Sequence, residues 1–203
     1  MSAGRAVAAA GDSATFAFTA ENVTKANAVV AKYPQGKQQS ALLPLLDLAQ
    51  RQNGGWLPQA ALDYVADFLT LARIRVYEVA TFYTMFNLKP VGQHHVQVCT
   101  TTPCWLRGSD QVLEACRHHL GIGVGETTAD GKFTLSEVEC LAACVNAPVV
   151  WVGDDYYEDL DAASTVKLLD GLAAGKPPKA GPQVKRQTSA PANGAKTLVR
   201  KGA

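Results

Sequence analysis

The sequence predicts an α+β protein, in which an N-terminal helical bundle is followed by a small domain built on a β-sheet. Up to about residue 86 the apolar residues recur at helical spacing, and from residue 95 onward they alternate as they do in strands. The chain has 203 residues, 47% of them hydrophobic, which suits one substantial domain or two small ones with buried cores. We expect a flexible leader at 1–18, the bundle at 19–90, the sheet domain at 91–175 and a basic tail at 176–203.

The composition excludes several classes of function. The formal net charge is +1, which creates no global field to attract nucleic acid, and basic residues are not interleaved with aromatic ones as in single-strand binders. The richest apolar stretch, residues 41–49, contains Pro44 and Asp47 and is far shorter than the roughly 20 residues that a membrane-spanning helix needs. We therefore expect no nucleic-acid partner and no direct insertion into a membrane.

The first 18 residues are rich in Ala, Gly and Ser. They carry little large apolar area to offset the entropy of ordering them, so we interpret them as a flexible leader. The stretch has a single Arg5 and lacks both the charged start and the Leu-rich centre of a secretory signal.

Three sets of apolar residues define the predicted bundle, and each forms a stripe on one helix face. They are Leu42, Leu45, Leu46 and Ala49; Leu62, Val65, Ala66 and Leu69; and Val76, Val79, Ala80 and Tyr83. Ser40 is an expected N-cap, Gly54 and Gly55 are expected to stop the second helix, and Pro58 suits a first helical turn. We interpret the bundle as a packing and docking module without chemistry of its own.

A second domain is expected after Lys89, Pro90 and Gly92. The expected elements are a strand at 95–99, a helix at 109–120 capped by Ser109 or Asp110, a strand at 133–138, a hairpin at 149–157 and a helix at 161–172. This order describes a small sheet with helices packed on it, as in thioredoxin-like folds.

The tail carries only basic charges. Its seven Lys and Arg residues are accompanied by no acidic residue, and its prolines and glycines argue against a packed fold. The simpler interpretation is a disordered, solvated tail. The alternative is a basic segment laid on an acidic partner, which is wrong if deleting residues 176–203 leaves assembly of the complex and its salt sensitivity unchanged.

Four of the five cysteines form two close pairs. Cys99 and Cys104 bracket the loop C-T-T-T-P-C at the end of a predicted strand, and Cys140 and Cys144 lie in E-C-L-A-A-C after another. Two strand-end loops can face each other at one edge of a sheet, which would bring the four thiolates together. Four thiolates without a histidine are the ligand set of an iron–sulfur cluster or of a structural zinc site.

The spacing of the pairs favours a cluster but leaves zinc open. Structural zinc sites commonly use C-x2-C pairs, whereas these pairs are C-x4-C and C-x3-C, and each of the two irons of a [2Fe-2S] unit needs two thiolates. A disulfide exchanger would present C-x-x-C, and a Rieske centre would use two histidines. We expect Cys116 to be a buried structural thiol and the four histidines, His94, His95, His118 and His119, to lie at the surface.

The number and distribution of cysteines also indicate the compartment. An odd number, with four of them in two close pairs, suits metal binding in a reducing compartment better than disulfides. Bacterial cytoplasm or the mitochondrial matrix is the expected environment.

At these residues the sequence resembles the small thioredoxin-like [2Fe-2S] subunit of NADH:quinone oxidoreductase, which is respiratory complex I. The shared motifs are Y-E-V-A-T-F-Y-T-M-F at 77–86, C-T-T-T-P-C-W-L-R-G-S at 99–109 and D-G-K-F-T-L-S-E-V-E-C-L-A-A-C-V-N-A-P-V-V at 130–150. The resemblance runs from about residue 20 to 175. One departure is Ala142, where the family more often has glycine; a methyl group is tolerated there unless the backbone needs a positive φ.

The resemblance implies that Cys99, Cys104, Cys140 and Cys144 bind one [2Fe-2S] cluster in a thioredoxin-like [2Fe-2S] ferredoxin domain. It implies docking on the flavin-bearing, NADH-oxidising subunit, which would hold FMN and NADH, and on further complex I subunits. It implies a peripheral location on the cytoplasmic side of a bacterial inner membrane, or on the matrix side in a mitochondrion. Related subunits serve NAD-linked formate dehydrogenases and NAD-reducing hydrogenases, and the motifs do not separate these well.

The expected chemistry is one-electron exchange with the flavin of the partner, and the resemblance implies a place off the main electron route. An oxidised [2Fe-2S] unit with four thiolates carries about two negative charges, so a low potential is expected, with loop amides offsetting part of the charge. Arg107 is interpreted most simply as an ordinary surface residue, and the alternative is that it also offsets cluster charge. The sequence contains no G-x-G-x-x-G, carboxylate pair or nucleophile constellation, so we expect no NADH binding and no bond-making site on this chain.

Two rival functions remain. One is a zinc-stabilised scaffold subunit, and the other is a free-standing ferredoxin that shuttles between enzymes. The helical module at 21–86 argues for fixed docking rather than shuttling.

Overall fold

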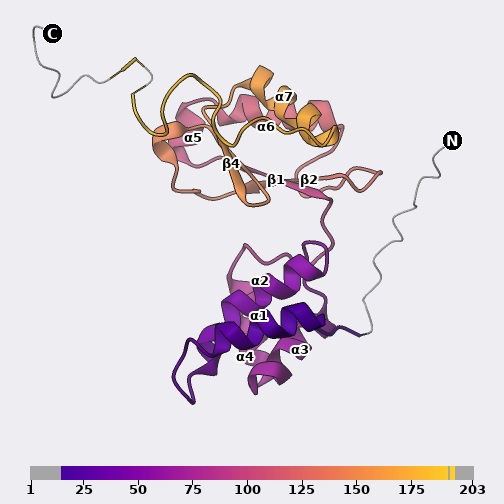
Figure 1. The fold of residues 1–203 in the computed structure, drawn as a ribbon. Helices are drawn as coiled ribbons and strands as arrows, with labels where there is room; N and C mark the ends of the chain where they lie inside the picture. Colours follow the sequence, from indigo (N-terminus) through magenta and orange to yellow (C-terminus); the bar gives the residue numbers. More distant parts are fainter. Residues whose placement is uncertain (1–14, 192, 195–203) are drawn as a thin grey trace, which may run out of the picture. The chain divides into compact units, whose positions relative to one another are not determined.

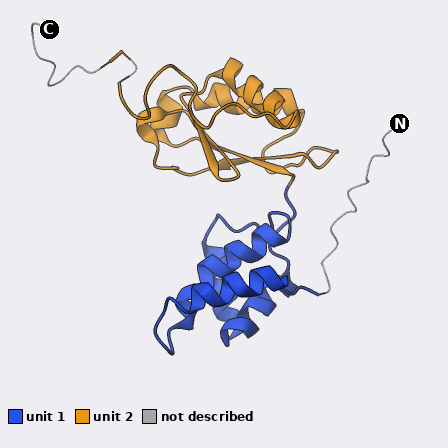
Figure 2. Ribbon diagram, in the orientation of Figure 1, with its two compact units in different colours: residues 1–91 blue, residues 92–203 orange. Residues whose placement is uncertain are grey.

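The computed structural model describes residues 15–191 together with residues 193 and 194 (Figure 1). These residues form two compact units, one up to Val91 and one from Gly92 onward (Figure 2). Most of the expected leader and the last residues of the expected tail, 195–203, lie outside the described residues. In the described part of the chain, no helix combines the length and the apolar character that crossing a membrane requires.

The first unit is a bundle of helices, as the periodicity predicts. Its elements are α1 (Ala20–Val30), the 3-10 helix η1 (Gln38–Ala41), α2 (Leu42–Gln52), α3 (Gln59–Leu69) and α4 (Arg73–Phe82). The apolar stripes of α2, α3 and α4 line a common core, whose fully buried residues include Leu45, Leu46, Val65, Leu69 and Val76. Removal of these side chains from water holds the helices together. The prediction for Tyr83 is wrong, because α4 ends at Phe82 and Tyr83 is exposed.

The two ends of α2 fit the prediction differently. Gly54 follows the helix with a φ of +74°, the left-handed conformation that commonly ends helices, as predicted. The expected cap Ser40 instead lies inside η1, and Ala41 precedes α2 without a side-chain hydrogen bond. The prediction for Ser40 is wrong because a 3-10 turn leads directly into the α-helix and satisfies backbone groups that a cap would otherwise satisfy.

Two residues of the expected leader belong to the bundle. Phe16 and Phe18 pack edge-on against each other and against Tyr64 of α3, with ring centroids between 5.2 and 5.7 Å apart. Only 7% of Phe18 is exposed. The packed chain therefore begins before residue 18, because two aromatic rings supply apolar area that the surrounding Ala-rich sequence lacks.

The second unit is a mixed sheet with helices packed on it. Its elements are β1 (His94–Cys99), α5 (Thr102–Leu106), α6 (Ser109–Leu120), β2 (Phe133–Val138), the 3-10 helix η2 (Cys144–Asn146), β3 (Val149–Val152), β4 (Asp155–Glu158), α7 (Ala162–Ala173) and β5 (Gly181–Pro182). Among the described residues the strand order is β2-β1-β3-β4-β5; β2 is parallel to β1 and β5 to β4, and the other neighbours are antiparallel. Helices α6 and α7 lie side by side and share a core with the sheet (Figure 1). This is the predicted α+β fold class.

Three local features of this unit differ from the prediction. Part of the first cysteine loop forms α5, which places Cys104 on a helix. Helix α6 begins after Gly108, whose φ is +95°, and Ser109 is buried in the first turn instead of capping it. Gly181 and Pro182, expected in a disordered tail, pair with β4 as an additional strand. An edge strand offers unpaired backbone groups to an extended segment, which composition alone does not reveal.

Candidate iron–sulfur site

Two neighbouring parallel strands lead into the site. The last residue of β1, Cys99, is paired in register with Val138, the last residue of β2, and Cys140 follows two residues later. Because the strands are parallel, both chain segments leave the sheet at the same edge. The structure therefore brings the two predicted cysteine loops to one edge.

The first pair is buried. Cys99 is 2% exposed at the end of β1, and Cys104 is 1% exposed on α5. Pro103 lies in the first turn of α5, where no backbone donor is needed, and the N–H of Trp105 donates to the carbonyl of Thr101 at 2.9 Å. This helical turn places Cys104 within hydrogen-bonding reach of Cys99.

Hydrogen bonds separate the pKa values of the buried pair. Burial alone would raise the pKa of Cys99, but hydrogen bonds from the Thr101 hydroxyl and from the backbone N–H of Leu141 outweigh it, so this pKa lies below its ordinary value. Burial and the hydrogen bond to Cys99 raise the pKa of Cys104 to about 12.

The second pair is exposed. The sulfur atoms of Cys140 and Cys144 are 3.4 Å apart. Between them Ala142 has a φ of +63°, and its N–H donates to the Cys140 sulfur at 3.4 Å. The loop does require the left-handed conformation that glycine adopts without strain, so the methyl group of Ala142 is not neutral here.

The exposed pair repeats the pKa pattern of the buried one. The backbone N–H of Ala142, followed by a hydrogen bond with Cys144, lowers the pKa of Cys140, and the hydrogen bond to Cys140 raises the pKa of Cys144. In both pairs the thiol with the higher pKa is hydrogen-bonded to the sulfur with the lower pKa. Binding of a metal by all four sulfurs therefore has to release protons.

The two loops contact each other through hydrogen bonds to their sulfur atoms. The Thr101 hydroxyl is 3.3 Å from the Cys99 sulfur and also hydrogen-bonds Cys140. A small apolar cluster joins the loops: its buried members are Cys99, Cys104, Ala147 and Val149, and Leu141, Ala143 and Tyr156 pack against them. All four predicted cysteines thus lie at one site.

The donor set fits a metal group ligated by sulfur. Two thiolates on one tetrahedral metal, at bonds of about 2.3 Å, lie about 3.8 Å apart, which is close to the 3.4 Å between Cys140 and Cys144. Among the described residues no group of three or more His, Cys, Asp or Glu side chains is already placed to hold a metal ion. A group bound by all four sulfurs would therefore draw the pairs together, with each pair serving one iron of a [2Fe-2S] unit.

The fifth cysteine and the histidines lie elsewhere. Cys116 is fully buried on α6, in the core of the second unit, and burial raises its pKa to about 12, which confirms the predicted structural thiol. His118 and His119 are exposed on α6, as predicted. His94 and His95 are half-buried on β1, where His95 hydrogen-bonds Ser136, because this strand is central in the sheet.

Sequence reasoning missed two residues that contact the loops. Thr101 lies between the cysteines of the first loop. Only this place in the sequence could have identified it as a residue of the site. Arg186 donates to the carbonyl of Val145, beside Cys144, at 3.2 Å; it lies 41 residues away along the chain, so no local pattern could reveal it. Arg107 is exposed, in agreement with its interpretation as a surface residue.

Comparisons with known proteins identify the family of the chain. Residues 26–173 match the family model described as thioredoxin-like [2Fe-2S] ferredoxin. The chain is 61% identical over 157 residues to the E subunit of NADH-quinone oxidoreductase from Rickettsia conorii, covering 77% of this chain and 94% of that protein. It is 56% identical over 184 residues to "NADH dehydrogenase [ubiquinone] flavoprotein 2, mitochondrial" of Dictyostelium discoideum, covering 91% of this chain and 74% of that protein.

A more distant likeness concerns the fold alone. A solved structure of an NAD+-reducing [NiFe]-hydrogenase aligns with a TM-score of 0.56 at 21% identity, over 65% of this chain. The chain spans 23% of that hydrogenase chain. By the family match and by its relatives, the chain belongs to the thioredoxin-like [2Fe-2S] ferredoxin family.

Proposed function

We propose that this chain is the electron-carrying subunit of the NADH-oxidising module of an NADH:quinone oxidoreductase, and that Cys99, Cys104, Cys140 and Cys144 hold one [2Fe-2S] cluster. The meeting of two cysteine pairs at one sheet edge, in a chain of the thioredoxin-like [2Fe-2S] ferredoxin family, carries the proposal. The names of the relatives at 56% and 61% identity support the same enzyme class.

The surroundings of the four sulfurs differ on the two sides of the site. When bound, the cluster supplies a store for one electron. The buried thiols of Cys99 and Cys104 keep water from one side, whereas Cys140 and Cys144 leave the other side open. We therefore expect electrons to enter and leave on the side of the exposed pair.

Backbone N–H groups supply the electrostatic support of the site. The N–H of Leu141 donates to Cys99, and the N–H of Ala142 donates to Cys140. Both bonds stabilise negative charge on sulfur, which favours the more negative, reduced state. In each loop, one cysteine sulfur thus accepts a hydrogen bond from a backbone amide of the second loop.

Exposed apolar side chains adjoin the cysteines in the sequence and suit a docking surface. Trp105 and Leu106, which follow Cys104, are 55% and 71% exposed, and Val145, which follows Cys144, is 70% exposed. Trp105 and Leu106 line one hollow of the surface, and exposed apolar patches commonly mark an interface. We assign to it a flavin-bearing, NADH-oxidising subunit that holds FMN and NADH, within a complex containing further subunits.

The location follows from the same proposal. A subunit of such a complex would be peripheral, on the cytoplasmic side of a bacterial inner membrane or on the matrix side in a mitochondrion. An equivalent place in a hydrogenase is less well supported, because the likeness to that enzyme rests on 21% identity and the likeness to NADH dehydrogenase subunits on 56 to 61%.

One set of variants tests the proposal. Anaerobically purified full-length protein is expected to contain two irons and two acid-labile sulfides per chain, and the native assembly to change its visible spectrum on addition of NADH. Alanine at Cys99, Cys104, Cys140 or Cys144 is expected to abolish the cluster signal. Alanine at Cys116 is the matched control and is expected to leave the signal intact.

Two results would contradict the proposal. A colourless protein with zinc and no sulfide would indicate the scaffold alternative. An isolated monomer without a stable flavoprotein partner would indicate the shuttling ferredoxin.

A further inference from the structure

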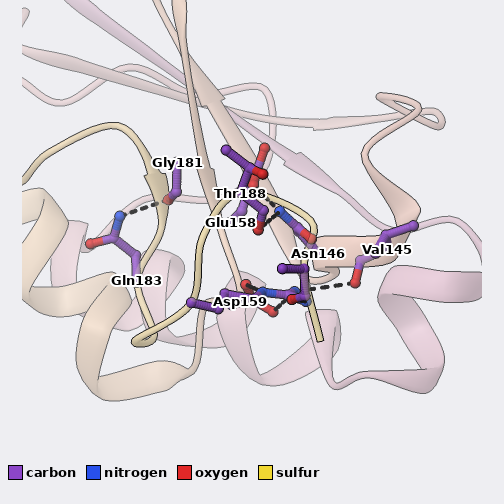
Figure 3. Close-up of polar contacts among 9 residues, drawn as sticks. Val145, Asn146, Glu158, Asp159, Gly181, Gln183 and Thr188 are labelled. Carbon is purple, nitrogen blue, oxygen red and sulfur yellow. Dashed lines mark hydrogen bonds and ion pairs between the residues drawn. The ribbon is translucent and has the colours of Figure 1, made fainter. Parts of the chain in front are cut away.

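A segment of the expected tail folds back onto the turn that carries Cys144. We name residues 179–190 the clamp segment. It contains β5, whose Gly181 and Pro182 pair with Tyr157 and Glu158 of β4. Figure 3 shows Thr188 of this segment close to Asn146, the second residue after Cys144, whereas Gln183 lies beside Gly181 at the start of the segment.

A buried ion pair anchors the clamp segment. The Arg186 guanidinium donates to both carboxylate oxygens of Asp159, one of them at 2.7 Å through Nε. The two side chains are 8% and 9% exposed. A bidentate pair of this kind fixes both the distance and the orientation of its partners, which a lysine in the same place would not do.

The same arginine reaches the cysteine turn. Its Nη2 donates to the carbonyl of Val145 at 3.2 Å, while its Nη1 donates to the carbonyl of Ala190 at 3.3 Å. Arg186 therefore links three segments of chain: the turn after Cys144, the end of β4 and the clamp segment itself.

Asn146 makes a second link between the same segments. Its side-chain Nδ2 donates to the Glu158 carboxylate and to the carbonyl of Thr188, the latter at 3.3 Å, and its backbone carbonyl accepts from the N–H of Asp159 at 2.7 Å. Asn146 is 5% exposed, although Cys144 two residues earlier is exposed. The turn η2 is thus held from one side while its cysteine faces outward.

From this geometry we propose that Arg186 is a positioning residue for the second cysteine pair. By holding Val145 against Asp159, it fixes the three-residue turn η2 and with it the sulfur of Cys144. A 3-10 turn of three residues has too few internal hydrogen bonds to fix a ligand by itself. The role toward a cluster rests on the proposed function, whereas the fixing of the turn does not.

The first test needs no cluster. In the full-length apoprotein, Arg186→Ala is expected to accelerate hydrogen exchange at the amides of Asn146 and Asp159 on the order of tenfold. The amides of Trp105 and Arg107 in the first cysteine loop serve as internal reference and are expected to stay unchanged. Equal acceleration in both loops, which would report general loosening, overturns the proposal, and so does no change in either loop.

Matched variants distinguish the effect of losing the Arg186–Asp159 ion pair from the effect of losing one basic charge. Lys185→Ala removes the neighbouring, exposed basic residue and is expected to have no effect. Asp159→Asn removes the charge at a position with a φ of +54°, a conformation that asparagine tolerates. It should match Arg186→Ala, and the double variant should add little, because both changes break one interaction. Arg186→Lys should restore part of the protection.

The second test uses the loaded protein. Arg186→Ala and Asp159→Asn are expected to shift the g-values of the reduced cluster and to accelerate its loss to an iron chelator several-fold, whereas Lys185→Ala does neither. Unchanged g-values in the variants overturn the positioning role even if exchange accelerates. If the wild-type protein holds no cluster, the proposed function fails, and the exchange experiment still decides whether Arg186 fixes the turn.

Discussion

The backbone N–H of Ala142 donates to the sulfur of Cys140 over 3.4 Å, and it does so from the left-handed region, at a φ of +63°. The amide can reach the sulfur only because the loop turns sharply at this residue. The hydrogen bond is thus obtained at the expense of backbone strain, since the alanine methyl group crowds the carbonyl in that conformation.

Ala142→Gly is expected to stabilise the protein. Glycine removes a strain of about 1 to 2 kcal/mol but adds freedom to the unfolded chain, so we expect a net gain of about 0.5 to 1 kcal/mol. Chemical denaturation of the full chain measures the change. Ala143→Gly is the matched control, because Ala143 has a φ of −94°, and it is expected to destabilise. A loss of stability in both variants would show that Ala142 is not strained.

Thiol alkylation in the apoprotein is expected to distinguish Cys140 from Cys116. Cys140 is exposed and its pKa lies below 9.0, so it forms thiolate at lower pH than an ordinary cysteine, and its alkylation should reach half-maximal rate below pH 9.0. Cys116 is buried with a pKa raised to about 12 and should react only after unfolding. Mass spectrometry after iodoacetamide treatment over a pH series measures both. Equal rates in the folded protein would contradict this assignment.

Phe18→Ala is expected to destabilise the helical unit strongly. Phe18 is 7% exposed and packs against Tyr64 and Phe68, so truncation leaves a cavity and should cost about 3 to 5 kcal/mol. Denaturation followed by circular dichroism measures the loss. The matched truncation Phe82→Ala, at a residue 76% exposed, should change stability by less than about 0.5 kcal/mol. Similar values for the two would mean that the leader does not contribute to the core.

Asp161 is expected to make stability depend on pH through its cap on α7. Its carboxylate accepts from the N–H of Ser164 at 2.7 Å, and the hydrogen bonds from the Ser164 hydroxyl and backbone lower its pKa below 3.8. The contribution is therefore complete above pH 3.8 and is lost as pH falls through the lower, folded pKa.

Two substitutions test this cap. Asp161→Ala should cost about 1 kcal/mol near neutral pH, whereas Asp161→Asn should retain most of the cap. Denaturation between about pH 2 and 7 should show a smaller acid loss in Asp161→Asn than in the wild type. An identical acid loss would exclude Asp161 as its source.

Strong local patterns predicted much of the fold. The spacing of apolar residues at 109–120 and at 133–138 predicts the bounds of α6 and β2 as the structure has them. Each of these elements presents one apolar face to a core. The pairing of the cysteines at one sheet edge also followed from sequence, since strands that end in cysteine loops leave little choice of where the loops go.

The rest depended on contacts that no local pattern encodes. Helix α5 has only five residues and no apolar period of its own. Arg186 pairs with Asp159, which lies 27 residues away in the sequence. The basic, Pro-rich and Gly-rich composition of residues 176–203 does not predict that ion pair. The positive φ of Ala142 likewise depends on how the loop meets its neighbour, so the alanine alone suggested no strain.

The pairing register of β1 and β2 sets the relative position of the two cysteine loops. Six residue pairs are in register, from His94 opposite Phe133 to Cys99 opposite Val138. One residue inserted into either strand alone would slide its cysteine loop by about 3.3 Å, more than the length of a sulfur–metal bond, about 2.3 Å. The register of this ladder therefore decides whether the two cysteine loops leave the sheet side by side.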